Sequence, residues 1–187
     1  PEDVRRAAAD AVMTGWNQYP PMMGLPELRQ AVSTHYALHQ GVSLDWESEV
    51  MITSGATEAL AGALMALIQP GDEVVLFQPL YDAYLPLVLR AGGIPKFVRL
   101  EPPHWRFDEA QLRQAFSPKT RVVLLNNPLN PSATIAPRED LELLARFCIE
   151  NDAVALCDEV WEHVVFDGAT HLSMLAIPGM RERTVKI

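Results

Sequence analysis

From residue 50 onward, the sequence alternates between short apolar runs and longer segments with helical spacing. The runs have the length and composition of buried strands, and they cover Glu73–Phe77, Ile94–Leu100, Arg121–Leu125 and Ala153–Cys157. Helices are expected between them, at Leu60–Ile68, Leu80–Ala91, Asp108–Phe116 and from Pro137 to Cys148. Parallel strands joined by helical crossovers need helices on both faces of the sheet. The pattern therefore predicts an α/β fold, a three-layer sandwich around a mostly parallel sheet.

The N-terminal part reads differently. Residues 3–13 are Ala-rich and predict a helix, and a second helix opens at Pro26 and ends at Gly41. The irregular stretch between them carries Trp16 and Tyr19, which is typical of a partner surface or a binding site.

Two short extended segments complete the expected elements. Val50–Thr53 predicts a first strand, and Thr184–Ile187 predicts the opening of another. Because the chain begins within a helical pattern and stops at such an opening, we expect residues 1–187 to be part of a larger protein.

Composition excludes several classes of function. The 187 residues carry a net charge of −9 without a basic cluster, so no positive face for nucleic acid is expected. No apolar run reaches the roughly 18 residues of a membrane span, and no signal peptide opens the chain, which favours a cytoplasmic protein. Cys148 and Cys157 lie in apolar segments without metal-ligand spacing. Buried reduced thiols are expected there, and no metal site.

The strand-like run Ala153–Cys157 ends in two carboxylates, Asp158 and Glu159. Ligands of open α/β sheets bind outside the carboxyl ends of the strands, so Asp158 stands where chemistry is expected. A cap on the following turn is the alternative interpretation.

Three more candidate sites follow other strands. The turn at Gly55, Ala56 and Thr57 opens a helix, where backbone N–H groups and the helix dipole favour a phosphate, although many strand-to-helix joints look alike. Tyr81 can stack on a flat heteroaromatic ring or pack in the core. Asn130 belongs to a repeated Asn-Pro pair, and the proline after it keeps this residue from adopting a helical conformation. Its side chain is then either aimed at a ligand as a hydrogen-bond donor or part of a plain structural turn.

In combination these pieces resemble the pyridoxal-phosphate aminotransferases of classes I and II, which have fold type I. The matching segments occur in the family's order, and they are Tyr19–Arg29, Ser54–Ala59, Pro79–Asp82, Asn127–Pro131 and Asp158–Trp161. The resemblance implies that residues 1–187 are an incomplete large domain of such an enzyme, with pyridoxal 5'-phosphate as cofactor.

The resemblance also implies roles for single residues. Gly55, Ala56 and Thr57 would hold the phosphate, and Tyr81 would stack on the pyridine ring. Asn130 would reach the ring hydroxyl and the substrate carboxylate. Catalytic Asp158 would keep the pyridine nitrogen protonated. Tyr19 would reach the phosphate of the neighbouring subunit, which requires a homodimer. The peptide bonds before Pro79 and Pro131 are often cis in this family, and the same is expected here.

Trp161 departs from the family pattern. Most relatives carry Tyr at this position, where its hydroxyl contacts the ring hydroxyl of the cofactor. An indole N–H can donate there, but it can neither accept nor ionise. Ser132 and Ala133 also replace the Thr-Gly of many relatives, which affects only the turn.

The family's catalytic lysine lies beyond Ile187 in this alignment of motifs, as does the small domain, so we expect the 187-residue chain to be inactive alone. The parent protein is expected to exchange an amino group between an amino acid and a 2-oxo acid, within amino-acid metabolism and biosynthesis.

Alternatives are a carbon-sulfur β-lyase, a ligand-sensing domain of a transcription regulator, and a non-catalytic relative. Lyases tend to carry His in place of Trp161. Aromatic, sulfur-containing, acidic and succinylated donors all stay open.

Overall fold

The fold is taken from a computed structural model that describes residues 1–15 and 17–187. Trp16, part of the predicted partner surface, lies outside the described residues. The chain divides into two compact units, Pro1–Thr53 and Ser54–Ile187, which are described separately.

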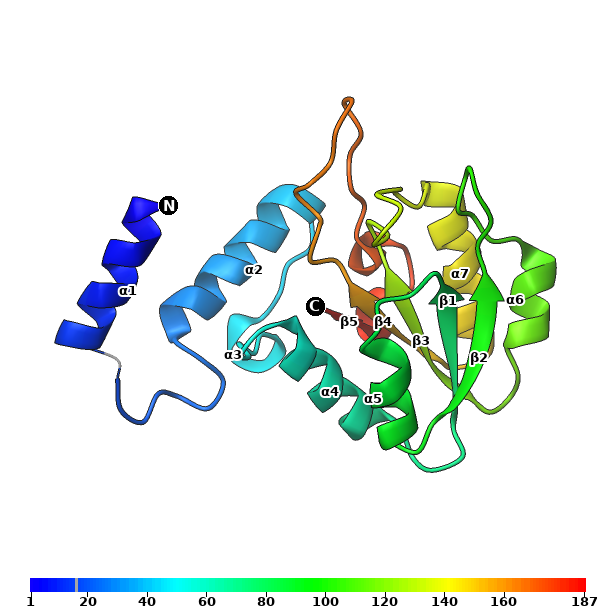
Figure 1. The fold of residues 1–187 in the computed structure, drawn as a ribbon, viewed down its shortest axis with the longest axis horizontal. Coiled ribbons are helices and arrows are strands. Elements are labelled where there is room, and N and C mark those ends of the chain that lie inside the picture. Colours follow the sequence, from blue (N-terminus) through cyan, green and yellow to red (C-terminus); the bar gives the residue numbers. More distant parts are fainter. Residues whose placement is uncertain (16) are drawn as a thin grey trace. The chain divides into compact units, whose positions relative to one another are not determined.

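The second unit is built on a five-stranded sheet in which every pair of neighbours is parallel. The strand order is β2-β1-β3-β4-β5 (Figure 1). The strands are β1 (Glu73–Gln78), β2 (Ile94–Arg99), β3 (Thr120–Asn126), β4 (Val154–Asp158) and β5 (Thr184–Lys186). This arrangement confirms the predicted parallel sheet and four of its strands, together with the strand at the C-terminal end.

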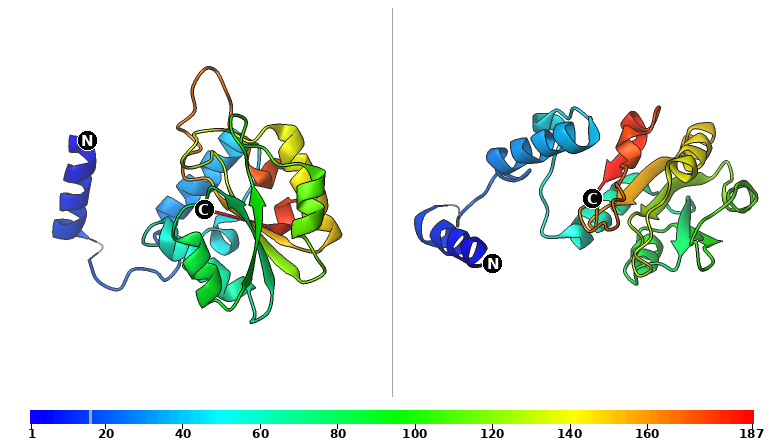
Figure 2. Two further views of the ribbon diagram at one scale, coloured as in Figure 1. Left: turned by 45° about the vertical axis from the view of Figure 1, so that its right-hand side comes forward. Right: turned by 90° about the horizontal axis from the view of Figure 1, so that it is seen from above.

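Helices cover both faces of this sheet (Figure 2). On one face, α4 (Ala56–Leu67) and α5 (Tyr84–Arg90) pack against alternate strand residues such as Leu124 and Leu156. On the other face, α6 (Glu109–Ala115) and α7 (Arg138–Glu150) pack against the residues between, such as Leu125 and Cys157. The two apolar clusters confirm the three-layer sandwich, because successive strand residues point to opposite faces.

Two sequence expectations are wrong in detail. Val50–Thr53 forms no strand; within the first unit, the backbone N–H of Ile52 donates to Met23 O at 2.9 Å. The helix expected from Leu80 begins only at Tyr84, since Pro79 and the residues after it form a turn at the end of β1. Both segments are short and apolar, and the spacing of apolar residues in such a short segment does not show which structure it forms or which neighbour it packs against.

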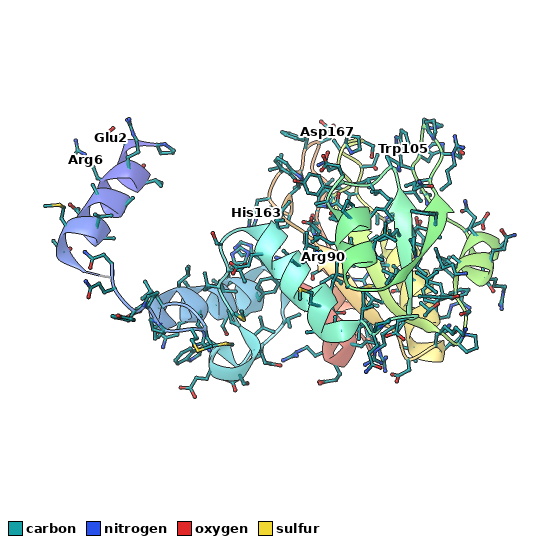
Figure 3. All side chains as sticks on the ribbon, turned by 60° about the horizontal axis from the view of Figure 1, so that its bottom comes forward. Glu2, Arg6, Arg90, Trp105, His163 and Asp167 are labelled. Carbon is teal, nitrogen blue, oxygen red and sulfur yellow. The ribbon has the colours of Figure 1, made fainter. Side chains whose placement is uncertain are left out.

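The first unit consists of α1 (Glu2–Thr14), α2 (Pro26–Gln40) and α3 (Trp46–Glu49). Within it, buried Arg29 donates to Val50 O at 2.8 Å and to Glu47 O at 2.6 Å, with its guanidinium 5.3 Å from the Trp46 ring centroid. In α1, by contrast, every residue is exposed, and Arg6 pairs with Glu2 one turn earlier at 3.2 Å (Figure 3).

No described helix has both the length and the apolar character that a membrane span requires. Both cysteines are free and buried, as expected. Burial raises the pKa of the Cys148 thiol to about 12, so this residue is an inert core thiol.

Candidate active site

Two neighbouring strands end in polar residues at the same edge of the sheet. Asn126 is the last residue of β3 and Asp158 the last of β4, and the two are register partners. Alternation along each strand puts both side chains on the face covered by α4 and α5, following Leu124 and Leu156. The parallel register therefore brings an amide and a carboxylate together at the carboxyl end of the strands.

Asp158 is buried, with 5% of its surface exposed, and is held at both carboxylate oxygens. The Tyr84 hydroxyl donates to its Oδ2 at 2.6 Å, and the backbone N–H of Val160 donates to Oδ1 at 3.2 Å. Burial and the adjacent Asp158 carboxylate raise the pKa of Tyr84 far above its ordinary value, so this hydroxyl stays protonated and remains a donor. The site thus contains a fixed, hydrogen-bonded carboxylate.

A pocket of about 210 Å³ opens beside Asp158. Six of the residues predicted for the site line it: Ala56, Thr57, Tyr81, Asn130, Asp158 and Trp161. Four further residues complete the lining, and they are Leu60, Tyr84, Asn126 and Val160. All of these lining residues belong to the second unit.

The phosphate-type turn forms the N-terminus of α4. Gly55 is the N-cap residue with φ of 81°, a left-handed value that favours glycine. Ala56 and Thr57 occupy the first turn and reach the pocket, while Gly55 stands beside them outside the lining. The free N–H groups of a first helical turn attract an anion. This end of the pocket is therefore suited to a phosphate.

Two aromatic residues border the pocket and remain partly accessible. Tyr81 is 41% exposed and Trp161 is 45% exposed. The Tyr81 ring meets the Tyr84 ring edge-on, with centroids 5.6 Å apart and planes at 75°. An accessible aromatic face against a pocket provides a stacking surface for a planar ring.

The Asn-Pro segment after β3 is tied to Asp158 through Asn126. The Asn126 side chain donates from Nδ2 to the backbone oxygen of Asp158 at 2.9 Å and accepts the Asn130 N–H at 2.7 Å. The peptide bonds before Pro79 and Pro131 are cis, as expected, and so are those before Pro103 and Pro128.

Glu159, the residue just after β4, points away from the pocket toward Ser173 and Met174. It is 1% exposed and accepts hydrogen bonds from Ser173 Oγ at 3.1 Å and from the Met174 N–H at 3.2 Å. His171 Nε2 lies 3.4 Å from its other carboxylate oxygen. Burial raises the pKa of Glu159 to about 8. These contacts attach the chain returning at the 3-10 helix η1 (Met174–Ala176) to the end of β4.

The segment between β4 and η1 projects past the carboxyl end of the strands (Figure 1). It carries Trp161 at its start, and His163 and Asp167 are labelled on it in Figure 3. Lys186 Nζ reaches this segment from β5 and pairs with Glu162 at 2.8 Å. A second tie thus holds the segment close to Trp161.

Two predicted site residues do not line this pocket. Gly55 caps α4 just beside it. Tyr19 belongs to the first unit, where it is 96% exposed and has φ of 47°. Conversely, Tyr84 and Asn126 were missing from the sequence-based site. Asn126 carries a recognisable signal, because it is a polar residue that ends a buried apolar strand, as Asp158 does.

Comparisons with known proteins match this architecture. The family model described as aminotransferase class I and II matches residues 1–184. A probable N-succinyldiaminopimelate aminotransferase (DapC) of Mycobacterium tuberculosis is 42% identical over 189 residues, and the alignment covers 100% of this chain and 48% of that protein. The methionine aminotransferase of Escherichia coli is 40% identical over 187 residues, with the same coverage.

The solved structures give the same result. The structure of N-succinyldiaminopimelate aminotransferase from Mycobacterium tuberculosis superposes with a TM-score of 0.96 at 41% identity, covering 100% of this chain and 49% of that one. The chain spans about half the length of the curated relatives it matches.

Proposed function

The chain belongs to the class I and II aminotransferases, and from this premise we propose that the whole protein is a pyridoxal-phosphate-dependent aminotransferase. It would move an amino group between an amino acid and a 2-oxo acid. The observation that carries the proposal is the buried carboxylate of Asp158, at the end of β4, in one pocket with a helix N-terminus and an aromatic ring.

The residues of the pocket fit the family's cofactor, pyridoxal phosphate. The first turn of α4, at Ala56 and Thr57 with the Gly55 cap, would hold the phosphate group. Tyr81 would cover one face of the ring, and Asn130 would bind the ring hydroxyl and the substrate carboxylate. When bound, the cofactor supplies an electron sink for the carbanion left after the substrate loses its α-proton.

Asp158 would hold a proton on the ring nitrogen. A cation is destabilised by burial, and an adjacent carboxylate offsets that cost. Because Tyr84 Oη and Val160 N both donate to this carboxylate, its position is set before any ligand arrives. Because the carboxylate is already in place, little rearrangement of the site is needed to stabilise the protonated ring nitrogen.

Trp161 lines the pocket where most relatives have Tyr. Its indole N–H would donate to the ring hydroxyl and, unlike a phenol, cannot take up or release a proton there. Lyases of this fold tend to carry His here, so this residue favours transamination over β-elimination.

The test uses the full-length protein and its Asp158→Asn variant. Wild type with pyridoxal phosphate and 2-oxoglutarate should form glutamate from at least one aromatic, sulfur-containing, acidic or succinylated donor. The variant should still bind cofactor but turn over by orders of magnitude more slowly, roughly 10³-fold if the pairing contributes about 4 kcal/mol. Transamination by the variant near the wild-type rate would refute the assignment.

Two other outcomes separate the rival functions. Release of pyruvate from cystathionine, without glutamate formation, would identify a carbon-sulfur lyase. Cofactor-dependent DNA binding by the full-length protein, without turnover, would identify a regulator; the net charge of −9 on this chain does not favour it.

We propose further that the whole protein is a cytoplasmic homodimer in which Tyr19 of one subunit reaches the phosphate held by the other. The nearly complete exposure of Tyr19 within its unit supports this role, and the two free buried cysteines are consistent with a reducing compartment. Residues 1–187 would form part of the large domain. Sedimentation of the full-length protein, and a lower cofactor affinity of Tyr19→Phe, test the shared site.

A further inference from the structure

We infer that Asn126 is a positioning residue of this site, whose side-chain amide fixes Asn130 relative to Asp158. The inference rests on the proposed function, in which these two residues bind opposite sides of one ring. Asn126 itself would act through them.

Both ends of the Asn126 amide are occupied by backbone groups. Nδ2 donates to Asp158 O at 2.9 Å, and Oδ1 accepts from Asn130 N at 2.7 Å. A carbonyl oxygen only accepts and a backbone N–H only donates, so the orientation of the amide is determined by its partners. The side chain therefore links the end of β4 to the Asn-Pro segment.

The link lies inside the pocket wall. Asn126 is only 7% exposed and lines the pocket together with Asn130 and Asp158. Its backbone is held by the β3 ladder, in register with Asp158. Of the three residues, Asn130 is the one outside a strand. Neighbouring Leu129 is held to Thr134 by a 2.8 Å backbone bond, and the Asn130 N–H is tied to β3 through Asn126.

Only an amide of this length can serve both partners. Asp in its place keeps the acceptor for Asn130 N–H but has no donor for Asp158 O. Ala removes both bonds and leaves a partly buried N–H without its acceptor, which is costly.

The adjacent Asn127 provides a matched control. It is also buried, at 2% exposure, and its Oδ1 accepts from Ala136 N at 2.9 Å, which holds the same Asn-Pro segment. Its side chain does not line the pocket. Its backbone N–H donates to Asp158 O at 3.1 Å, and Asn127→Ala retains that bond.

The first experiment needs no cofactor. Hydrogen exchange at Asn130 N–H is measured in the full-length apoprotein. Asn126→Ala should lower protection at this amide on the order of tenfold or more, Asn126→Asp should restore it, and Asn127→Ala should leave it unchanged. Wild-type protection in Asn126→Ala, or equal loss in Asn127→Ala, would overturn the inference. Asn126→Ser, too short to span both partners, replaces Asn126→Ala if the latter does not fold.

The second experiment measures binding of pyridoxal phosphate. Asn126→Ala should raise the dissociation constant for pyridoxal phosphate about tenfold and change the induced circular dichroism of the bound cofactor. Asn127→Ala should change neither. Equal effects of the two variants, or none for Asn126→Ala, would contradict the positioning role. If wild type itself does not bind the cofactor, the proposed function fails, whereas the exchange experiment still decides whether Asn126 fixes Asn130.

Discussion

Replacing Tyr84 with Phe removes one hydroxyl from the centre of the site and nothing else. The Tyr84 side chain is 2% exposed, and its hydroxyl donates to Asp158 Oδ2 at 2.6 Å. The raised pKa of Tyr84, caused first by burial and then by Asp158, means that the protonated form stabilises the fold. That stabilisation is fully present below the unfolded-state pKa near 10 and is lost only as the pH rises beyond it.

The magnitude follows from the type of bond. A hydrogen bond to a charged group contributes about 1.5–3 kcal/mol, and among the described residues the buried carboxylate would keep its bond from the Val160 N–H. At pH 7 we expect Tyr84→Phe to lower the free energy of unfolding by about 2 kcal/mol. With a urea m-value of roughly 2 kcal/mol per molar, the midpoint should fall by about 1 M.

The assay is urea unfolding of the cofactor-free chain followed by circular dichroism, with Tyr81→Phe as the control. Tyr81 is 41% exposed and lies edge-on to the Tyr84 ring, so the same substitution there should change stability by less than about 0.5 kcal/mol. If both variants shift the midpoint equally, or neither does, the hydroxyl of Tyr84 does not hold Asp158 as described.

Two further predictions concern stability. The pKa of Glu159, about 8 against an ordinary 4.5, means that its protonated form stabilises the fold and that this contribution is lost as pH rises toward 8. The lowered pKa of His171 has the opposite effect only below its ordinary 6.5. Burial lowers the pKa of Lys186 to about 8, which opposes the decline near and above pH 8. Between pH 6.5 and 7.5 wild type should therefore lose up to about 1.4 kcal/mol per pH unit. Glu159→Gln should be flat in urea titrations across that window, and a parallel decline would refute the assignment. Gly24→Ala should destabilise the first unit by about 2 kcal/mol or more, because φ is +93° and a Cβ would lie 2.5 Å from Ile52 Cβ. Gly41→Ala, with φ of +66° and open space, should cost only about 1 kcal/mol in the same denaturation assay, and equal costs would contradict the steric argument.

Periodicity was sufficient to predict the layers of the second unit. Alternating apolar residues such as Leu124 and Leu125 separate into two clusters on opposite faces, as a parallel sheet covered by helices requires. Periodicity failed at Val50–Thr53, which has the composition of a strand but forms none. Strand formation depends on a neighbour, and a single segment does not reveal whether it has one.

The site was predictable to the extent that its residues follow strand ends. Asp158, Tyr81 and Asn130 were found in this way, and the pocket brings them together. Tyr84 was missed because it lies 74 residues from Asp158 along the chain. Their contact depends on how α5 is placed against the end of β4, which the sequence does not show. Asn126 ends a strand as Asp158 does, but its partners are backbone groups, and that part of its role leaves no trace in the sequence.

The pairing of Asn126 with Asp158 in register has a consequence for anyone transplanting this chemistry into another scaffold. If β3 were shifted by one residue against β4, the Asn126 side chain would point to the other face of the sheet. This would happen even if every loop had been copied without change. A successful graft would therefore have to reproduce the alignment of two interior strands, and libraries that vary only the surface turns should never recover it.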